Sequence, residues 1–150
     1  MTLYQILDFV ADSYNPIALA VLLAVIIKEY QITSKAKGMI SAVSLLSGLF
    51  IVYGIQWIDK AFGIWSRFGL DYSTHTAFSI CIITLSVSLR VRGREIILLS
   101  LAGYLLLMLY QGYHTLMDIA ATGIVIFPLL IVLLLSGRRV QDKLCDTVEK

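Results

Sequence analysis

Residues 114–135 read HTLMDIAATGIVIFPLLIVLLL, and this stretch decides the class of fold. The run is as long as the roughly 20 predominantly apolar residues that a helix needs to cross a bilayer. Asp118 is its only Asp, Glu, Lys or Arg, and Pro128 predicts a kink within it. The stretch therefore predicts a transmembrane helix that carries a histidine and an aspartate near its start.

The whole chain shares this apolar character. Hydrophobic residues make up 59% of its 150 residues and charged residues 15%, whereas a soluble domain is about half apolar and about a quarter charged. A net charge of +2, with no basic run interleaved with aromatic residues, excludes a nucleic-acid partner. Cys81 and Cys145 are too few and too far apart for a disulfide framework or a metal site. We expect one membrane-embedded domain over residues 1–150.

Hydropathy predicts an all-α fold: a polytopic membrane helix bundle of about five transmembrane helices plus a short N-terminal interfacial helix. The predicted spans cover residues 15–30, 39–57, 73–91, 96–110 and 114–135.

Two features predict contacts with the membrane interface. Residues 1–13 place Leu3, Ile6, Leu7 and Val10 at helical spacing, which indicates a helix lying on the membrane surface. Aromatic residues also gather near the ends of the spans, and they predict an interfacial belt of Tyr53, Trp57, Trp65, Tyr72, Tyr110 and Tyr113.

Basic residues predict the orientation of the bundle. In a five-span alternation most of them fall on one side: Lys28, Lys35, Lys37, Arg90, Arg92, Arg94, Arg138, Arg139 and Lys143. The positive-inside rule makes this side cytoplasmic, so the N-terminus lies outside and the C-terminus in the cytoplasm. On the outer side, basic residues occur only in loop 58–72, as Lys60 and Arg67.

The remaining polar residues assemble at the outer face. His75 and His114 fall in the first turns of two spans that both start there, and helix N-termini attract anions. Lys60 and Arg67 add positive charge at the same face. Because residues four apart stack on a helix, Asp118 is expected to accept the Nδ1–H of His114 and leave Nε2 free to act as a nucleophile or base.

These residues also follow a known order. Lys60-x6-Arg67, Ser73-Thr74-His75 and His114-x3-Asp118 resemble the three signature blocks of the type-2 phosphatidic acid phosphatase superfamily of membrane lipid phosphatases. The family blocks read K-x6-R-P, P-S-G-H and S-R-x5-H-x3-D. Members usually have six spans, so five spans resemble the catalytic core without the first helix.

The chain departs from the family pattern in each block. Phe68 replaces the first proline, and Tyr72 and Thr74 replace the proline and glycine of the second block. Leu107 and Met108 stand where the family has Ser-Arg, and that arginine normally grips the phosphate. Gln111 is the nearest candidate to supply the missing donor. An arginine at Met108 is expected to strengthen vanadate binding if the helix points that position at the site.

The resemblance implies an integral membrane enzyme that hydrolyses a lipid phosphate or diphosphate at the extracytoplasmic face, with a polyprenyl diphosphate as the first candidate substrate. It assigns His114 as the nucleophile that forms a phosphohistidine, Asp118 as its orienting carboxylate and His75 as the general acid and base. The phosphoryl group is expected to be held by Lys60, Arg67, Ser73, Thr74 and Gln111. Neither a cofactor nor a metal is expected.

Two other functions stay open. "STHT", residues 73–76, is similar to the pattern of related phosphotransferases such as sphingomyelin synthases, which favours transfer to an acceptor alcohol. The second open function is that of a catalytically silent relative that binds anionic lipid. Several of these residues also have structural readings: His114 and Asp118 as an interhelical hydrogen-bonded pair, Ser73 as a helix N-cap, and Lys60 and Arg67 as contacts to lipid headgroups.

Overall fold

The computed structural model describes residues 2–89, 91 and 93–148, and within these ranges every regular element is helical. The α-helices are α1 (Leu3–Lys28), α2 (Lys35–Phe62), α3 (Thr74–Ser88), α4 (Arg94–Tyr110) and α5 (Leu116–Val148). A π-helix, η1 (Glu29–Thr33), follows α1, and a 3₁₀ turn, η2 (Ser66–Phe68), follows α2. The predicted all-α class is confirmed. Arg90 and Arg92 lie outside the described residues, as do the side chains of Lys143 and Cys145.

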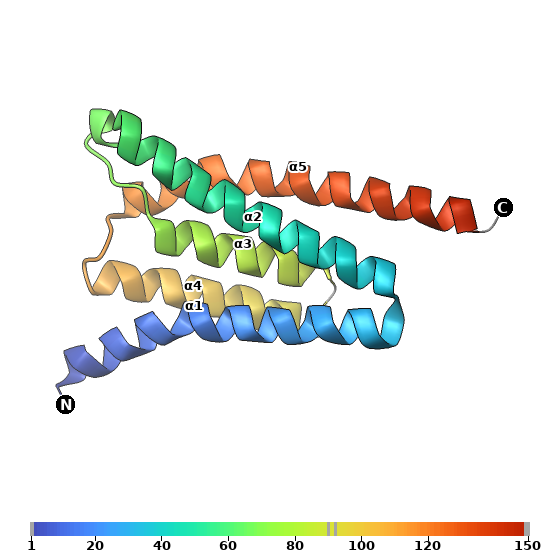
Figure 1. The fold of residues 1–150 in the computed structure, drawn as a ribbon. Helices are drawn as coiled ribbons and strands as arrows, with labels where there is room; N and C mark the ends of the chain where they lie inside the picture. The colour runs from blue at the N-terminus through green and yellow to red at the C-terminus, as the bar shows by residue number, and fades with distance from the viewer. Residues whose placement is uncertain (1, 90, 92, 149–150) are drawn as a thin grey trace.

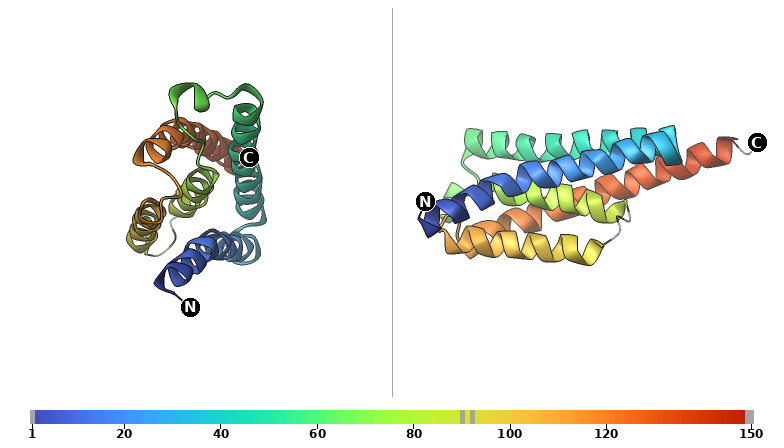
Figure 2. Two further views of the ribbon diagram at one scale, coloured as in Figure 1. Left: turned by 90° about the vertical axis from the view of Figure 1, so that its left-hand side faces the viewer. Right: turned by 90° about the horizontal axis from the view of Figure 1, so that it is seen from below.

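Successive helices run in opposite directions, so the two chain ends lie at opposite ends of the bundle (Figure 1). Loops 63–73 and 111–115 lie at the end that holds the N-terminus, which we call the histidine end. The other end holds η1, the start of α2 and the last part of α5 (Figures 1 and 2). We call it the basic end, because it carries Lys35, Lys37, Arg94, Arg138 and Arg139.

The short helix α3 forms the centre of the bundle. It contacts each of the other four helices, and Figure 2, viewed along the bundle, shows it among them. Its buried serine hydroxyls are paired: Ser79 and Ser86 donate to the carbonyls of His75 and Ile82, at 2.6 and 2.8 Å. Because these groups are paired, α3 can be buried although several of its side chains are polar.

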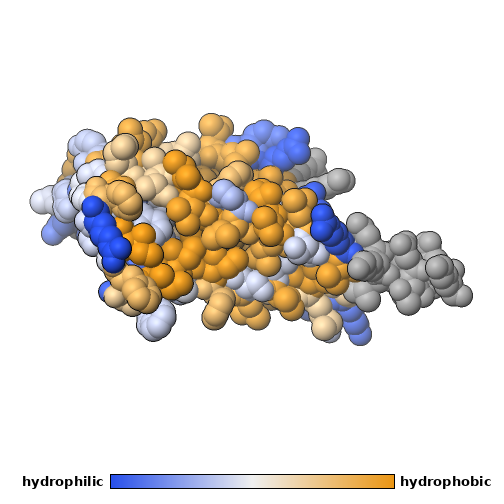
Figure 3. Space-filling model, turned by 90° about the horizontal axis from the view of Figure 1, so that it is seen from above, coloured by the Kyte–Doolittle hydropathy of each residue, from blue (hydrophilic) through white to orange (hydrophobic). Residues whose placement is uncertain are grey.

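Three helical stretches are long and apolar enough to cross a membrane: Leu3–Thr33, Lys35–Phe62 and Leu116–Gln141. Apolar side chains cover the middle of the face shown in Figure 3, and hydrophilic ones gather towards both ends. The prediction of five such spans is wrong in number, because α3 has 15 residues and α4 has 17. A helix rises 1.5 Å per residue, so both are shorter than ~30 Å of hydrocarbon.

A separate interfacial helix is not observed, which corrects the prediction for residues 1–13. Residues 3–28 form one helix that continues through Pro16, and a capping box between Thr2 and Gln5 starts it. Asn15, one residue before the proline, donates to the Tyr104 hydroxyl at 3.3 Å and accepts from the Ser79 hydroxyl at 2.9 Å. These bonds to α4 and α3 hold α1 against the bundle at the point where the sequence suggested a break.

Candidate active site

The residues of all three sequence blocks lie at the histidine end. Lys60 is in the last turn of α2, Arg67 is in η2, and Thr74 and His75 begin α3. Gln111 and His114 lie in the connection between α4 and α5. The fold therefore brings blocks that are far apart in the sequence to one end of the bundle (Figure 1).

Loop 63–73 is fixed by buried aromatic residues. Gly63 ends α2 in the left-handed conformation, with φ of 60°, and the Asp59 carboxylate accepts the Trp65 backbone N–H at 2.8 Å. The rings of Trp65 and Tyr72 pack edge to face at 5.1 Å, and the Tyr72 hydroxyl donates to the Val52 carbonyl at 2.9 Å. Burial raises the pKa of Tyr72, so this donor stays neutral. Trp65 and Tyr72 are core residues, and their assignment to an interfacial belt was wrong.

Ser73 is the N-cap of α3 and is fully buried. Its hydroxyl accepts the Thr76 backbone N–H at 3.3 Å and donates to the Thr76 hydroxyl at 2.7 Å. Its backbone N–H donates to the Thr122 hydroxyl on α5 at 3.1 Å. With its hydroxyl engaged in this way, Ser73 positions the first turn of α3, where Thr74 is half-buried and His75 is exposed.

Asp118 joins loop 63–73 to the start of α5. One carboxylate oxygen accepts the Asp71 backbone N–H at 2.7 Å, and the other accepts the backbone N–H and the hydroxyl of Thr115 at 2.8 and 2.7 Å. The Thr115 hydroxyl in turn accepts the Asp118 backbone N–H at 3.2 Å. This reciprocal pair is a capping box, with aspartate in place of the usual glutamate or glutamine.

The predicted bond from His114 to Asp118 is not observed. His114 precedes the residue that caps α5, so the two residues do not stack on one helix face. The carboxylate nearest to His114 is that of Asp71, whose Oδ2 lies 3.9 Å from Nδ1. Nothing in the sequence identifies Asp71 as this partner, whereas the capping signal Thr115-x-x-Asp118 is visible in it.

His114 is largely buried, with 12% of its side chain exposed. Burial lowers the pKa of His114 below its ordinary value, and His75 acts in the same direction, whereas Asp71 and Asp118 oppose the shift. Its Nδ1 is buried without a hydrogen-bond partner in the part of the chain that the structure describes. Burial of the ring therefore favours the neutral form of the His114 imidazole.

Gln111 and Met108 differ in what they can offer a ligand. Both polar side-chain atoms of Gln111 are buried and lack a partner among the described residues. Met108 is also buried, but it packs with Ala11, Tyr104 and Ile119 between α1, α4 and α5. Met108 thus belongs to the protein core, whereas the Gln111 amide makes no hydrogen bond within the described residues.

Lys60 and Arg67 are exposed at the histidine end. Within residues 2–89, 91 and 93–141, no hydrogen bond or ion pair joins either cation to a histidine or to Asp118. Nor does this part of the chain hold a cluster of three or more His, Cys, Asp or Glu side chains that could bind a metal ion. The site is thus two histidines with a neighbouring carboxylate, and two cations at the same end.

Replacing Asp118 with asparagine is expected to lower the free energy of unfolding by about 1–3 kcal/mol. The new amide nitrogen is a donor, and it would face either the Asp71 N–H or the Thr115 donors. Asp71→Asn is the matched control: its side chain is 79% exposed, and only its backbone donates to Asp118, so a change within about 0.5 kcal/mol is expected. Unfolding in detergent measures both, and equal stability of the two variants would contradict this role of Asp118.

In comparisons with protein-family models, with curated proteins and with solved structures, nothing matched this chain.

Proposed function

We propose that this protein is an integral membrane lipid phosphatase that hydrolyses a lipid phosphate or diphosphate through a phosphohistidine on His114. The observation that carries the proposal is the largely buried imidazole of His114, whose pKa is lowered by burial. It lies beside Asp71 and at the same end of the bundle as His75, Lys60 and Arg67. A neutral imidazole is a nucleophile, whereas a protonated one is not. The order of the sequence blocks adds independent support.

In the first step Nε2 of His114 attacks phosphorus, and the bond between phosphorus and the lipid oxygen breaks. Nδ1 keeps its proton, and the Asp71 carboxylate, 3.9 Å from Nδ1, stabilises the positive charge that develops on the ring. His75, exposed in the first turn of α3, donates a proton to the leaving lipid oxygen. In the second step His75 takes a proton from water, water attacks phosphorus, the P–N bond breaks and phosphate leaves.

The phosphoryl oxygens carry negative charge throughout, so the site needs donors around them. Lys60 and Arg67 supply positive charge. The backbone N–H of Thr74 lies in the first turn of α3, where N–H groups have no carbonyl partner within the helix, so it can donate to a phosphoryl oxygen. Gln111 supplies an amide in place of the family arginine. Ser73 contributes by capping α3, and Asp118 by holding Asp71 and the start of α5.

The apolar exterior suits a lipid substrate, whose chain stays in the bilayer while its phosphate reaches the histidine end. The basic residues at the other end favour the orientation in which the histidine end is extracytoplasmic and the C-terminus cytoplasmic. A polyprenyl diphosphate remains the first substrate to test.

Replacing Asp71 with asparagine is expected to move the acidic limb of kcat/KM to lower pH. His114 must be neutral to attack, so activity falls as the pH drops through its pKa, which burial has already lowered. Asp71 raises that pKa, and its removal lowers it further. Turnover at neutral pH should also fall about two- to fivefold, the worth of an exposed ion pair. An acidic limb that stays in place in a pH series would show that Asp71 does not act on His114.

Replacing Gln111 with alanine is expected to lower phosphate release at least about tenfold, because the phosphoryl group loses a donor in the transition state. The Gln111→Ala variant should keep its stability, because the Gln111 amide has no hydrogen-bond partner that its removal would leave unpaired. Tyr110→Phe is the control, because Tyr110 is 74% exposed, and it should have much less effect. Steady-state rates of the two variants decide the matter: unchanged activity in Gln111→Ala would remove Gln111 from the site.

A phosphate-release screen with purified protein tests the function as a whole. Phosphatidic acid, phosphatidylglycerophosphate and a polyprenyl diphosphate are offered in detergent, with and without an acceptor alcohol. Release of inorganic phosphate from at least one lipid is expected. Phosphorylated acceptor without free phosphate would instead identify a phosphotransferase, and binding without any turnover would identify a silent lipid-binding protein.

A further inference from the structure

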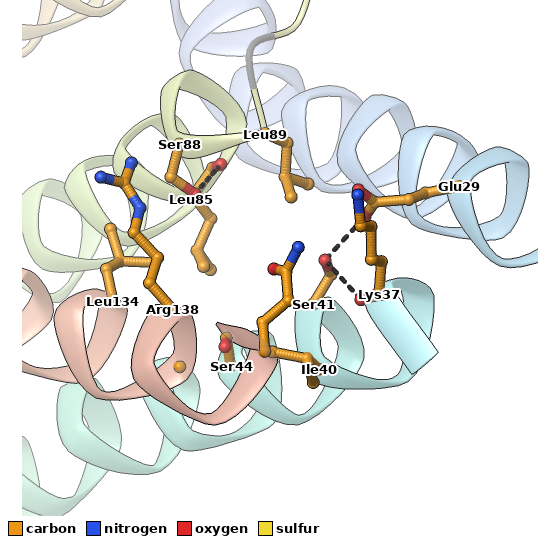
Figure 4. Close-up of a pocket in the computed structure, with 12 residues that line it drawn as sticks. Glu29, Lys37, Ile40, Ser41, Ser44, Leu85, Ser88, Leu89, Leu134 and Arg138 are labelled. Carbon is orange, nitrogen blue, oxygen red and sulfur yellow. Dashed lines mark hydrogen bonds between the residues drawn. The ribbon is translucent and has the colours of Figure 1, made fainter. Parts of the chain in front are cut away.

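A polar cleft of about 430 Å³ lies at the basic end, away from the histidines. Figure 4 shows Glu29 from η1, Lys37, Ser41 and Ser44 from α2, Ser88 from α3 and Arg138 from α5 around one hollow. Leu85, Leu89 and Leu134 contribute apolar surface. Its volume lies within the range of about 300–1,000 Å³ that is usual for small-ligand sites.

The π-helix η1 shapes one wall of this cleft. The Ser34 backbone N–H donates to the Glu29 carbonyl at 2.9 Å, five residues back. Short π-helical segments inside helical chains often occur at functional sites. The Glu29 carboxylate accepts the Ser41 hydroxyl at 2.7 Å, so one oxygen of this acid is engaged (Figure 4).

An apolar groove of about 980 Å³ adjoins the cleft. It runs between α3, α4 and α5 and is lined by residues such as Ile83, Leu101, Phe127 and Ile131. Ser88, Leu134 and Arg138 line both the groove and the cleft, so the two spaces meet at these residues. A polar compartment that opens into an apolar one is complementary to an amphiphile, which has a polar head and an apolar tail.

The charges favour an anionic amphiphile. Lys37 and Arg138 carry two positive charges, Glu29 carries one negative charge, and so the cleft has a net charge of +1. A phosphodiester carries one negative charge and balances it, and arginine matches the geometry of phosphate oxygens. The serine hydroxyls and the free oxygen of Glu29 can bond to headgroup hydroxyls.

We propose that this cleft and groove bind one anionic glycerophospholipid, with its phosphodiester between Lys37 and Arg138 and an acyl chain along α3, α4 and α5. Basic pockets between transmembrane helices are known to hold anionic headgroups. This site does not involve His114, and it stands whether or not the protein is a phosphatase.

Native mass spectrometry of the whole protein in detergent tests the proposal with two charge-matched double variants. Lys37→Gln with Arg138→Gln removes both cations of the cleft. Lys35→Gln with Arg139→Gln removes the same charge from the same two helices, at exposed positions that do not line the cleft. Thermal unfolding of both variants confirms that each is folded.

Phosphatidylglycerol is expected to bind the parental protein and the Lys35/Arg139 variant with similar affinity, and the Lys37/Arg138 variant at least about tenfold more weakly. Phosphatidylcholine should bind weakly to all three. Equal loss in both double variants, or equal binding of the two lipids to the parental protein, would overturn the proposal. So would full competition by glycerol 1-phosphate at equal concentration, because the cleft would then take a soluble phosphate without needing the groove.

Discussion

Replacing His114 with alanine is expected to reduce phosphate release from the best lipid substrate by at least about 10³-fold. The proposed reaction forms a covalent bond from the imidazole to phosphorus, and no other side chain of the site can take its place. His75 lies in the first turn of α3 and serves the leaving group, so it does not substitute for the nucleophile. Water would have to attack directly, without the positioned ring.

The same variant should stay folded, which separates loss of chemistry from loss of structure. The Nδ1 atom of His114 has no hydrogen-bond partner among the described residues, so its removal leaves no buried group unsatisfied. Ser136→Ala, which alters an exposed serine on α5 near the basic end, is a control for handling and detergent effects. Rates come from phosphate release and folding from thermal unfolding. A folded His114→Ala protein that turns over near the parental rate would contradict the mechanism.

Replacing Met108 with arginine is expected to destabilise the protein by about 3–5 kcal/mol, because it buries a charge without a partner. Met108 is 2% exposed and packs between α1, α4 and α5 against Ala11, Tyr104 and Ile119. Tyr104 is itself stacked on Tyr14, with ring centroids 4.2 Å apart, so Met108 packs against an aromatic pair. An arginine at this position should therefore harm the fold and bring no gain in vanadate binding.

Met108→Leu is the matched control, since it keeps the size and polarity of the side chain and should cost less than about 1.5 kcal/mol. The yield of folded protein, its thermal unfolding and its affinity for vanadate are compared for both variants. A folded Met108→Arg protein that binds vanadate more tightly would mean that this position reaches the phosphate. The resemblance to the phosphatase pattern would then extend to Met108.

Long apolar runs predicted where helices occur, because a chain in lipid must satisfy its backbone polar groups internally, and a helix does so within one segment. The predicted span 39–57 lies inside α2, and 96–110 matches α4 to within two residues. The position of a helix end depends on a single capping residue, and the helix ends were predicted less accurately than the helices themselves. Thr115 caps α5, so His114 falls outside the helix that the apolar run suggested.

The partners of the site residues could not be read from spacing. The sequence paired His114 with Asp118 because residues four apart meet on a helix, but Asp118 is taken by Thr115 and by the backbone of Asp71. Asp71 is distant in sequence and reaches His114 only because loop 63–73 folds over the start of α5. That loop position depends in turn on Trp65 and Tyr72. The sequence does not distinguish aromatic residues at a membrane interface from those in a core. Here Tyr72 lies in the core, where its hydroxyl donates to the Val52 carbonyl.

Trapping of the covalent intermediate tests the central claim most directly. The protein is mixed with a lipid phosphate or diphosphate that carries a radiolabel on its terminal phosphate, and the reaction is quenched within the first turnover. The account predicts a protein-bound label that is stable in base and lost in acid, on the peptide that contains His114 and absent from the His114→Ala variant. Phosphate release with no such label, or an identical label in His114→Ala, would contradict it.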